Sequence, residues 1–150
     1  MRIVLTTVTK ASVEIDNQVV GQINRGFCVL VGFTHDDTKV VVDKMIDKML
    51  GLRVFMDENG LTNLSIYDVA GEILSVSQFT LYADLAKGRR PSFVNAMKPE
   101  DAKALYEYFN EQIKIKFGAV QTGVFGADMK VNSVNDGPFT VVMDSKEIIK

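Results

Sequence analysis

The chain has 150 residues, a formal net charge of −2 and a hydrophobic fraction of 47%, values typical of a single globular domain. One cysteine, Cys28, and one histidine, His35, exclude an intramolecular disulfide and a cysteine-rich zinc site. No run reaches the roughly 18 apolar residues of a membrane span, and the first residues lack a signal-peptide pattern. We therefore expect a cytoplasmic protein with no membrane contact.

The sequence pattern in the first third of the chain predicts three strands followed by a helix. Alternating apolar residues predict a long strand over Arg2–Ile15, and a turn at Asp16-Asn17 predicts a return strand over Val19–Ile23. The apolar run FCVLVGF after Gly26 is typical of a strand buried on both faces. The short oxygen-bearing side chains of residues 34–37 then predict a helix start.

That first helix is supported by apolar residues at helical spacing, and Gly51 is its predicted end. A short strand is expected over Arg53–Met56, followed by a turn at residues 57–60. Glu72–Tyr82 is expected to form one further strand. Pro99 is expected to open a second helix that ends at Gly118. The segment from residue 120 to residue 143 predicts short strands broken by glycines.

This order of elements predicts an α/β fold in which a mixed sheet is combined with two main helices. The pattern F-T-x-x-x-D occurs twice, at Phe79–Asp84 and at Phe139–Asp144. The repetition suggests an internal pseudo-repeat, in which two related halves lie symmetrically in one sheet. No linker or low-complexity segment divides the chain, so residues 1–150 are expected to form a single domain.

The residue types most often used in catalysis give weak signals. His35 has aspartates beside it in sequence, but neighbouring residues on a helix do not face each other, so a solvated helix-start residue is favoured. Cys28 lies within an apolar strand, where a thiol is structural and unreactive. The acidic groups around Asp57 lack the later ligands of a calcium loop, and Asp43 and Asp47 are interpreted as a solvated helix face.

Three polar segments are better candidates for a site. The segment Ser77-Gln78-Phe79-Thr80 places hydrogen-bonding side chains around an aromatic ring at the expected end of a strand, and strand alternation would put Ser77 and Phe79 on one side. Lys87, Arg89 and Arg90 form the densest basic loop, which would suit phosphate. The segment 135–140, N-D-G-P-F-T, holds a Gly-Pro pair whose backbone could closely approach a ligand.

These segments resemble the D-aminoacyl-tRNA deacylase family over the whole chain. The resemblance begins with MRIVLTTVTKASVEID, includes SVSQFTLYADLAKGRRPSF and ends with VNSVNDGPFTVVMDS. The patterns S-Q-x-T and N-x-G-P-x-T are both present in the expected order. The resemblance implies a barrel-like sheet and a homodimeric editing enzyme without a cofactor. Such an enzyme hydrolyses the ester between a D-amino acid and the terminal adenosine of tRNA, removes mischarged glycine, and does not act on DNA.

The resemblance also implies roles for individual residues. Residues Ser77, Gln78, Phe79 and Thr80 would form the catalytic segment around the aminoacyl group. The Gly137-Pro138 peptide would be cis and would reach into the partner subunit's site, where Asn135 and Thr140 support it. Lys87, Arg89 and Arg90 would bind the acceptor end of tRNA.

A rigid backbone filter of this kind would collide with an L side chain but admit a D side chain or a hydrogen atom. Glycine would therefore pass the filter, in agreement with the family's activity. The family is thought to use the RNA 2′-hydroxyl to assist the hydrolytic water. The protein would then supply orientation and backbone N–H groups near Phe79 that stabilise the developing oxyanion, and Thr80 would support the site without being acylated.

Two other functions remain open from the residues alone. The first is an esterase that uses Thr80 as a nucleophile or His35 as a base. The second is a module without catalysis that binds the end of tRNA through Lys87, Arg89 and Arg90. The first predicts an acyl-enzyme on Thr80 or loss of activity in His35→Ala, and the second predicts binding with no ester cleavage.

Overall fold

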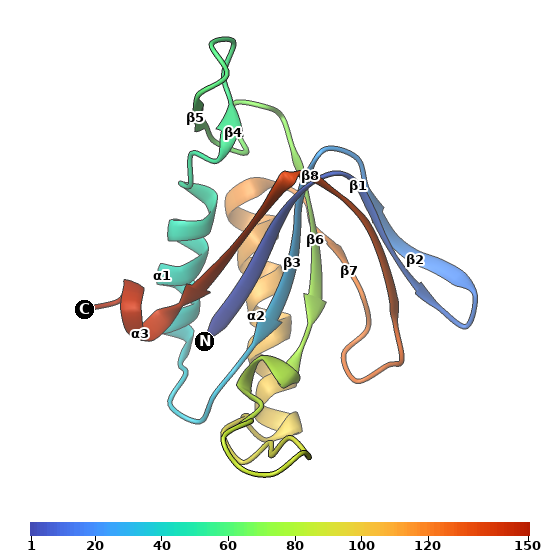
Figure 1. Cartoon of the computed structure of the whole chain (residues 1–150), viewed down its shortest axis with the longest axis vertical. Helices are drawn as coiled ribbons and strands as arrows, with labels where there is room; N and C mark the ends of the chain where they lie inside the picture. Colours follow the sequence, from blue (N-terminus) through green and yellow to red (C-terminus); the bar gives the residue numbers. More distant parts are fainter.

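The computed structural model describes residues 1–150 and shows one domain built around a strongly curved sheet (Figure 1). The main sheet has six strands: β1 (Arg2–Ile15), β2 (Gln18–Ile23), β3 (Gly26–Gly32), β6 (Glu72–Ser77), β7 (Gln121–Thr122) and β8 (Lys130–Asp144). The remaining strands, β4 (Phe55–Met56) and β5 (Thr62–Leu64), form a separate hairpin. The helices are α1 (Lys39–Leu50), α2 (Pro99–Phe117), the short α3 (Ser145–Ile148) and the 3₁₀-helix η1 (Phe79–Tyr82).

The sheet is mixed, with β1 at its centre. Strand β1 pairs antiparallel with β3 through its first half, with β2 through its second half, and with β8 along its other edge. Strands β3, β6 and β7 are parallel to one another. Because β2 also comes into contact with β7, the sheet curls until it nearly closes. The predicted mixed, barrel-like sheet with two main helices is therefore confirmed.

Two apolar clusters stabilise this arrangement, one on each face of the sheet. Helices α1 and α2 cover one face, where Phe27 of β3 and Phe109 of α2 are fully buried in a cluster of 21 residues. A smaller cluster of seven residues, which includes Val8, Cys28 and Leu74, fills the inside of the curl. Strand β3 contributes to both clusters, as its continuous apolar run predicted.

The first helix begins later than the sequence indicated. Residues 34–37 form a turn in which the Asp37 carboxylate accepts a hydrogen bond from the Thr34 amide at 2.7 Å. Because Asp37 is engaged in this turn, the capping role passes to Thr38, whose hydroxyl accepts from the Val41 amide at the start of α1. The second helix begins at Pro99 and is followed by Gly118, as predicted.

The predicted strand over Glu72–Tyr82 is correct only to Ser77. The chain then turns into η1, so the strand alternation expected for Ser77–Thr80 is wrong. The tail also differs, because residues 130–144 form one long strand in place of short strands broken by glycines. Phe79–Asp84 therefore begins in a 3₁₀-helix while Phe139–Asp144 lies in a strand, so the two copies of the pattern F-T-x-x-x-D do not form the same kind of element.

Candidate functional site

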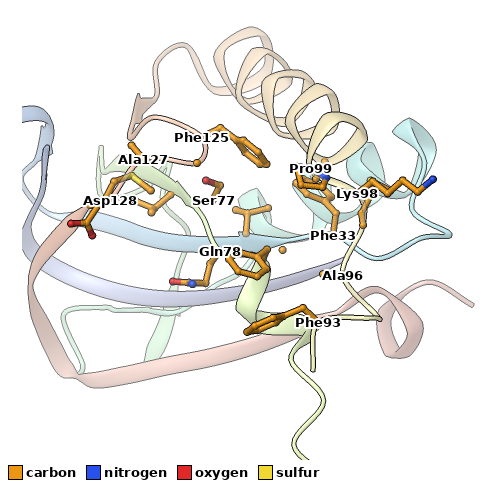
Figure 2. A pocket seen from close by; sticks show the side chains of 18 of the residues that line it. Phe33, Ser77, Gln78, Phe93, Ala96, Lys98, Pro99, Phe125, Ala127 and Asp128 are labelled. Carbon is orange, nitrogen blue, oxygen red and sulfur yellow. The ribbon is translucent and has the colours of Figure 1, made fainter. Parts of the chain in front are cut away.

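A cleft of about 680 Å³ opens where β3 and β6 end (Figure 2). Its walls come from the ends of these strands, from the start of η1, from the loop leading to α2, and from the loop that precedes β8. Twelve of its 19 lining residues are hydrophobic, and its charged side chains are Lys98 and Asp128. A mostly apolar cleft with a few polar groups is the usual form of a small-molecule site.

Ser77 and Gln78 are the uncharged polar side chains of the cleft. The Gln78 amide donates to the Val31 carbonyl at 2.7 Å, which holds the end of β6 against β3. Gly32 permits this close approach, because a Cβ atom there would lie 2.7 Å from the Gln78 carbonyl oxygen. The side-chain amide of Gln78 donates to the Thr80 hydroxyl at 2.5 Å. Ser77 and Gln78 are thus fixed by the backbone of the sheet.

Phe79 and Thr80 begin η1, and both are exposed. Phe79 lines the cleft with 53% of its surface accessible, whereas Thr80 does not line it. The only side-chain hydrogen bond of the Thr80 hydroxyl is the one from Gln78, and no carboxylate or imidazole contacts it. An acyl-enzyme mechanism needs a base that takes the proton of the nucleophile. The geometry around Thr80 provides no such base.

Phe93 forms an aromatic rim with Phe79 that sequence reasoning did not identify. The two rings meet edge to face with centroids 4.9 Å apart, and 40% of Phe93 is exposed. The loop that carries Phe93 is held to β3, because the Met97 amide donates to the Phe33 carbonyl at 3.0 Å. The sequence did offer one signal for Phe93, which is an aromatic residue close after a basic loop. Aromatic rings in such positions can stack on nucleobases.

Phe125 and Asp128 are further cleft residues that the sequence patterns did not single out. Both lie in the loop between β7 and β8, which reaches the cleft only because β7 is parallel to β6 and ends beside it. No motif marks this loop apart from Gly123 and Gly126, which predicted breaks between strands. The proximity therefore depends on the topology of the sheet.

Lys87, Arg89 and Arg90 form an exposed loop outside the cleft. The base of this loop is closed by two hydrogen bonds between the backbones of Asp84 and Ser92, at 2.7 and 3.0 Å. The ion pairs of the structure use other cations, so these three side chains are free to meet solvent. The loop follows η1 and precedes Phe93, which places its two ends at the aromatic rim of the cleft.

The Gly137-Pro138 segment does not line the cleft of its own chain. It lies exposed in β8, and its peptide bond is cis. The Asn135 side chain accepts from the Phe139 amide at 2.8 Å and donates to the Thr140 hydroxyl at 2.9 Å. The structure thus brings Asn135 and Thr140 together around Gly137-Pro138, and it separates all four from Ser77–Thr80 of the same chain.

Strand β1 holds the Gly137-Pro138 segment through a side-chain hydrogen bond. The buried Thr7 hydroxyl donates to the Asp136 carbonyl at 2.9 Å. The pairing of β1 with β8 shifts register on both sides of Val8, opposite the turn. Because of these register shifts, β8 can include the extra residues around Gly137-Pro138 and still pair with β1 on both sides of them.

The two reactive residue types that were considered at the sequence level lie outside the cleft. His35 is exposed, and its Nε2 atom lies 2.6 Å from the Val94 carbonyl. Cys28 is buried, and burial raises the pKa of its thiol to about 11, which makes the thiolate scarce at neutral pH. The predicted structural role of Cys28 is consistent with this burial.

No three of the histidine, cysteine, aspartate and glutamate side chains are grouped as metal ligands. None of the helices combines the length and the apolar character that crossing a bilayer requires.

Comparison with known proteins identifies the relatives of this chain. The model of the D-Tyr-tRNA(Tyr) deacylase family matches residues 4–144. The D-aminoacyl-tRNA deacylase of Lactobacillus gasseri is 56% identical over 144 residues, which is 96% of this chain and 99% of that protein. The D-aminoacyl-tRNA deacylase of Bacillus pumilus is 54% identical over 147 residues, which is 98% of this chain and all of that protein.

Two solved structures share the fold. A c-Myc DNA unwinding element binding protein superposes with a TM-score of 0.90 at 41% identity, covering 96% of this chain and 98% of that one. A probable eukaryotic D-amino acid tRNA deacylase superposes with a TM-score of 0.83 over 95% of this chain and 97% of that one. At 20% identity, the second likeness is one of fold alone.

Proposed function

The chain belongs to the D-Tyr-tRNA(Tyr) deacylase family and is a D-aminoacyl-tRNA deacylase, and we propose that it removes both D-amino acids and glycine from tRNA while it rejects L-aminoacyl-tRNA. The hydrolysis adds water across the ester. The water oxygen bonds to the carbonyl carbon, the bond from that carbon to the ribose oxygen breaks, and a proton passes to the ribose oxygen.

The cleft is the proposed site of this reaction. Its volume of about 680 Å³ lies in the usual range for small-molecule sites and suits an aminoacyl group attached to one nucleoside. The observation that carries the proposal is the position of Ser77, Gln78 and Phe79, which line a mostly apolar cleft side by side at the end of β6. There they would orient the ester, and backbone N–H groups near Phe79 would stabilise the oxyanion.

The proposed filter for chirality is Gly137-Pro138 of a second copy of the chain. The segment is exposed and lies away from its own cleft, so it is available to a partner. Strand β8 pairs on one edge only, and Val134 and Val142 are exposed along it. A two-fold dimer through this strand would place each Gly-Pro segment in the other copy's cleft. Backbone at that position would exclude an L side chain and admit a D side chain or hydrogen.

The proposed reactive helper is the 2′-hydroxyl of the terminal adenosine. Support comes from the surroundings of the Thr80 hydroxyl, which accepts from Gln78 and contacts no general base. Thr80 would then hold the Gln78 amide in place, and the substrate would supply the group that assists the water. Lys87, Arg89 and Arg90 would bind phosphates of the acceptor end in the cytoplasm, where aminoacylated tRNA is found.

One assay tests the reaction and its selectivity. Purified protein is incubated with matched D-aminoacyl-tRNA, L-aminoacyl-tRNA and glycyl-tRNA, and the remaining ester is measured over time. We expect fast loss of the D-aminoacyl and glycyl esters and persistence of the L-aminoacyl ester. Equal loss of D and L esters would contradict the backbone filter, and binding without any cleavage would indicate a tRNA-end-binding module.

A second experiment separates RNA-assisted hydrolysis from a Thr80 nucleophile. The Thr80→Ala variant is compared with the parent protein, and the parent is given a substrate that ends in 2′-deoxyadenosine. We expect a modest loss in the variant and a large loss with the deoxy substrate. Near-total loss in Thr80→Ala together with full activity on the deoxy substrate, or an acyl group trapped on Thr80, would establish the esterase mechanism instead.

A further inference from the structure

The phenol of Tyr106 lies beneath the strand that enters the cleft. Tyr106 belongs to α2, only 3% of it is exposed, and its hydroxyl donates to the Ser75 carbonyl at 2.8 Å. The Ser75 hydroxyl, which is fully buried, donates back to the Tyr106 oxygen at 3.4 Å. Tyr106 itself does not line the cleft, so it does not touch a ligand bound there.

Strand β6 needs such a partner because one of its edges is incompletely paired. Strand β3 covers one edge as far as Ser77, but the short β7 covers the other only at Leu74 and Ser75. Beyond Ser75 this second edge has no neighbouring strand, although buried backbone amides and carbonyls require hydrogen-bond partners. The Ser75 carbonyl accepts from the Gly123 amide at 3.1 Å and from Tyr106, where the pairing with β7 ends.

The Tyr106 hydroxyl is a neutral hydrogen-bond donor to the strand. Burial dominates and raises the pKa of Tyr106, and the hydrogen bond from the Ser75 hydroxyl acts in the opposite direction. At neutral pH the Tyr106 hydroxyl therefore donates to the Ser75 carbonyl. This contact holds β6 at the last residue that β7 pairs, two residues before Ser77 enters the cleft.

Tyr106 also contacts the opposite wall of the cleft. Its ring lies 6.1 Å from that of Phe125, centroid to centroid, and Phe125 lines the cleft. The same side chain therefore supports the polar strand end through its hydroxyl and an apolar wall through its ring. Figure 2 shows Phe125 and Ser77 facing the same space.

We propose that Tyr106 is a positioning residue for deacylation, because its hydroxyl fixes the Ser75 carbonyl and thereby sets where the residues that follow, Gln78 and Phe79, meet the ester. This inference rests on the proposed function of the Ser77–Thr80 segment. Positioning matters because a displacement of reacting groups by about 1 Å can cost up to about a hundredfold in rate. The ring of Tyr106 packs near Phe125, and its hydroxyl adds a hydrogen bond on the edge of β6 opposite the one that β3 pairs.

Tyr108 offers a matched control on the same helix. Its hydroxyl also hydrogen bonds, but to the Asp43 carboxylate of α1 at 3.0 Å, on the side of α2 away from β6. Tyr106→Phe and Tyr108→Phe each remove one hydroxyl from α2 and keep the ring. A loss specific to Tyr106→Phe therefore reports on the contact with Ser75.

The experiment measures kcat and KM for D-aminoacyl-tRNA and the hydrogen exchange of the amides from Val76 to Phe79. We expect about a tenfold lower kcat in Tyr106→Phe, with KM within about twofold, and faster exchange at Gln78, whose amide donates to the Val31 carbonyl at the strand end. Tyr108→Phe should match the parent protein in all three measurements. Equal kcat in the two variants, or a lower kcat with unchanged exchange at Gln78, would overturn the proposal.

The two readouts also separate this proposal from the proposed function. If the parent protein does not cleave D-aminoacyl-tRNA, the proposed function fails by itself. The exchange at Gln78 in Tyr106→Phe still reports whether the hydroxyl fixes the strand end, and unchanged exchange would overturn that role independently.

Discussion

The two polar motifs of this chain are positioned in opposite ways. Ser77–Thr80 begins at the last residue of the buried strand β6, which lies between β3 and β7, and its first three residues line a cleft in the same chain. Asn135–Thr140 lies exposed on β8, a strand that pairs on one edge only, and lines no cleft. The first motif is held by the main-chain hydrogen bonds of the sheet. The second is held by the side chains of Asn135 and Thr7.

This difference indicates which parts of the site one chain can build by itself. The cleft and its polar edge are set by topology, because parallel strands end together at one edge of the sheet. The Gly-Pro turn is rigidly supported but reaches nothing within its own chain. A turn that is so well braced and yet so exposed suits a role on another molecule, and the dimer of the proposed function gives it that role.

The largest expected change in activity comes from mixing two variants, one altered in each motif. This experiment tests whether the two motifs act in one site that is shared between two copies of the chain. Gln78→Ala alters the cleft, and Gly137→Ala strains the turn, because Gly137 has a φ of 135° and a Cβ there would lie 2.9 Å from the Phe139 amide nitrogen. We expect each variant alone to lose about a hundredfold in kcat/KM, the usual effect of removing an orienting group. When equal amounts of the two variants are refolded together, about half of the two-fold dimers contain one chain of each variant. One of the two sites in such a dimer is intact, so about a quarter of the parent activity should return.

The recovery depends on a site shared between copies. A mixed dimer pairs one intact cleft with one intact turn, so only that combination is active. The control mixes two preparations of Gln78→Ala, which should stay inactive. If the mixture of different variants shows no recovery although mixed dimers form, each chain uses its own Gly-Pro segment and the shared site is wrong.

Asn135→Ala should give a smaller effect on the exposed motif. The variant loses the hydrogen bonds to the Phe139 amide and the Thr140 hydroxyl. Because the turn is exposed, we expect a loss of only about 1 kcal/mol in the free energy of unfolding, but about a tenfold lower kcat/KM, since the turn is less well placed. Denaturant unfolding and deacylation kinetics measure the two quantities.

Asn132→Ala is the matched control for that variant. Asn132 is exposed on the same strand, and its side chain is not engaged in the hydrogen bonds of the turn. It should keep the parent activity. Equal kinetics in Asn132→Ala and Asn135→Ala would show that bracing of the turn is irrelevant to catalysis.

The sequence predicted the elements whose periodicity is long and regular. Strand β1 has the bounds that its alternating residues indicated, and α2 begins at Pro99 and is followed by Gly118. The predicted bounds were wrong where a side-chain hydrogen bond or the end of strand pairing, and not the hydrophobic periodicity, determines where an element begins or ends. Asp37 bonds the Thr34 amide and delays α1 to Lys39. Strand β6 ends at Ser77 because its pairing with β3 ends there, and no local signal marks that tertiary limit.

Three of the predicted site residues, Ser77, Gln78 and Phe79, line the cleft, whereas Thr80 and the Gly137-Pro138 pair do not. The other walls of the cleft were not predicted. Phe93, Phe125 and Asp128 line the cleft because distant loops converge on it, which depends on the parallel pairing of β6 with β7. The role proposed for Tyr106 depends on where β7 stops. Contacts of this kind follow from three-dimensional packing, which a single sequence does not reveal.

The basic loop provides the smallest and last test, because it lies outside both motifs. Arg89 and Arg90 are exposed and absent from the ion pairs, so they are available to phosphate. If each contacts one phosphate of the single-stranded acceptor end, each Arg→Ala change should reduce the salt-dependence slope of log affinity by about 0.7. The loss of affinity at one salt concentration would be modest, so the slope is the sharper measurement.

A lysine outside the basic loop provides the control for the salt-dependence slope. Lys103 is an exposed cation of α2 whose nearest carboxylate, Glu107, lies 4.0 Å away, and it does not line the cleft. Lys103→Ala removes the same charge from the chain, so a nonspecific effect of net charge would lower its slope equally. We expect the parent slope for Lys103→Ala and lower slopes for the two loop variants. The same slope in all three variants would assign the loop to solvent and leave tRNA binding to the cleft and the partner's turn.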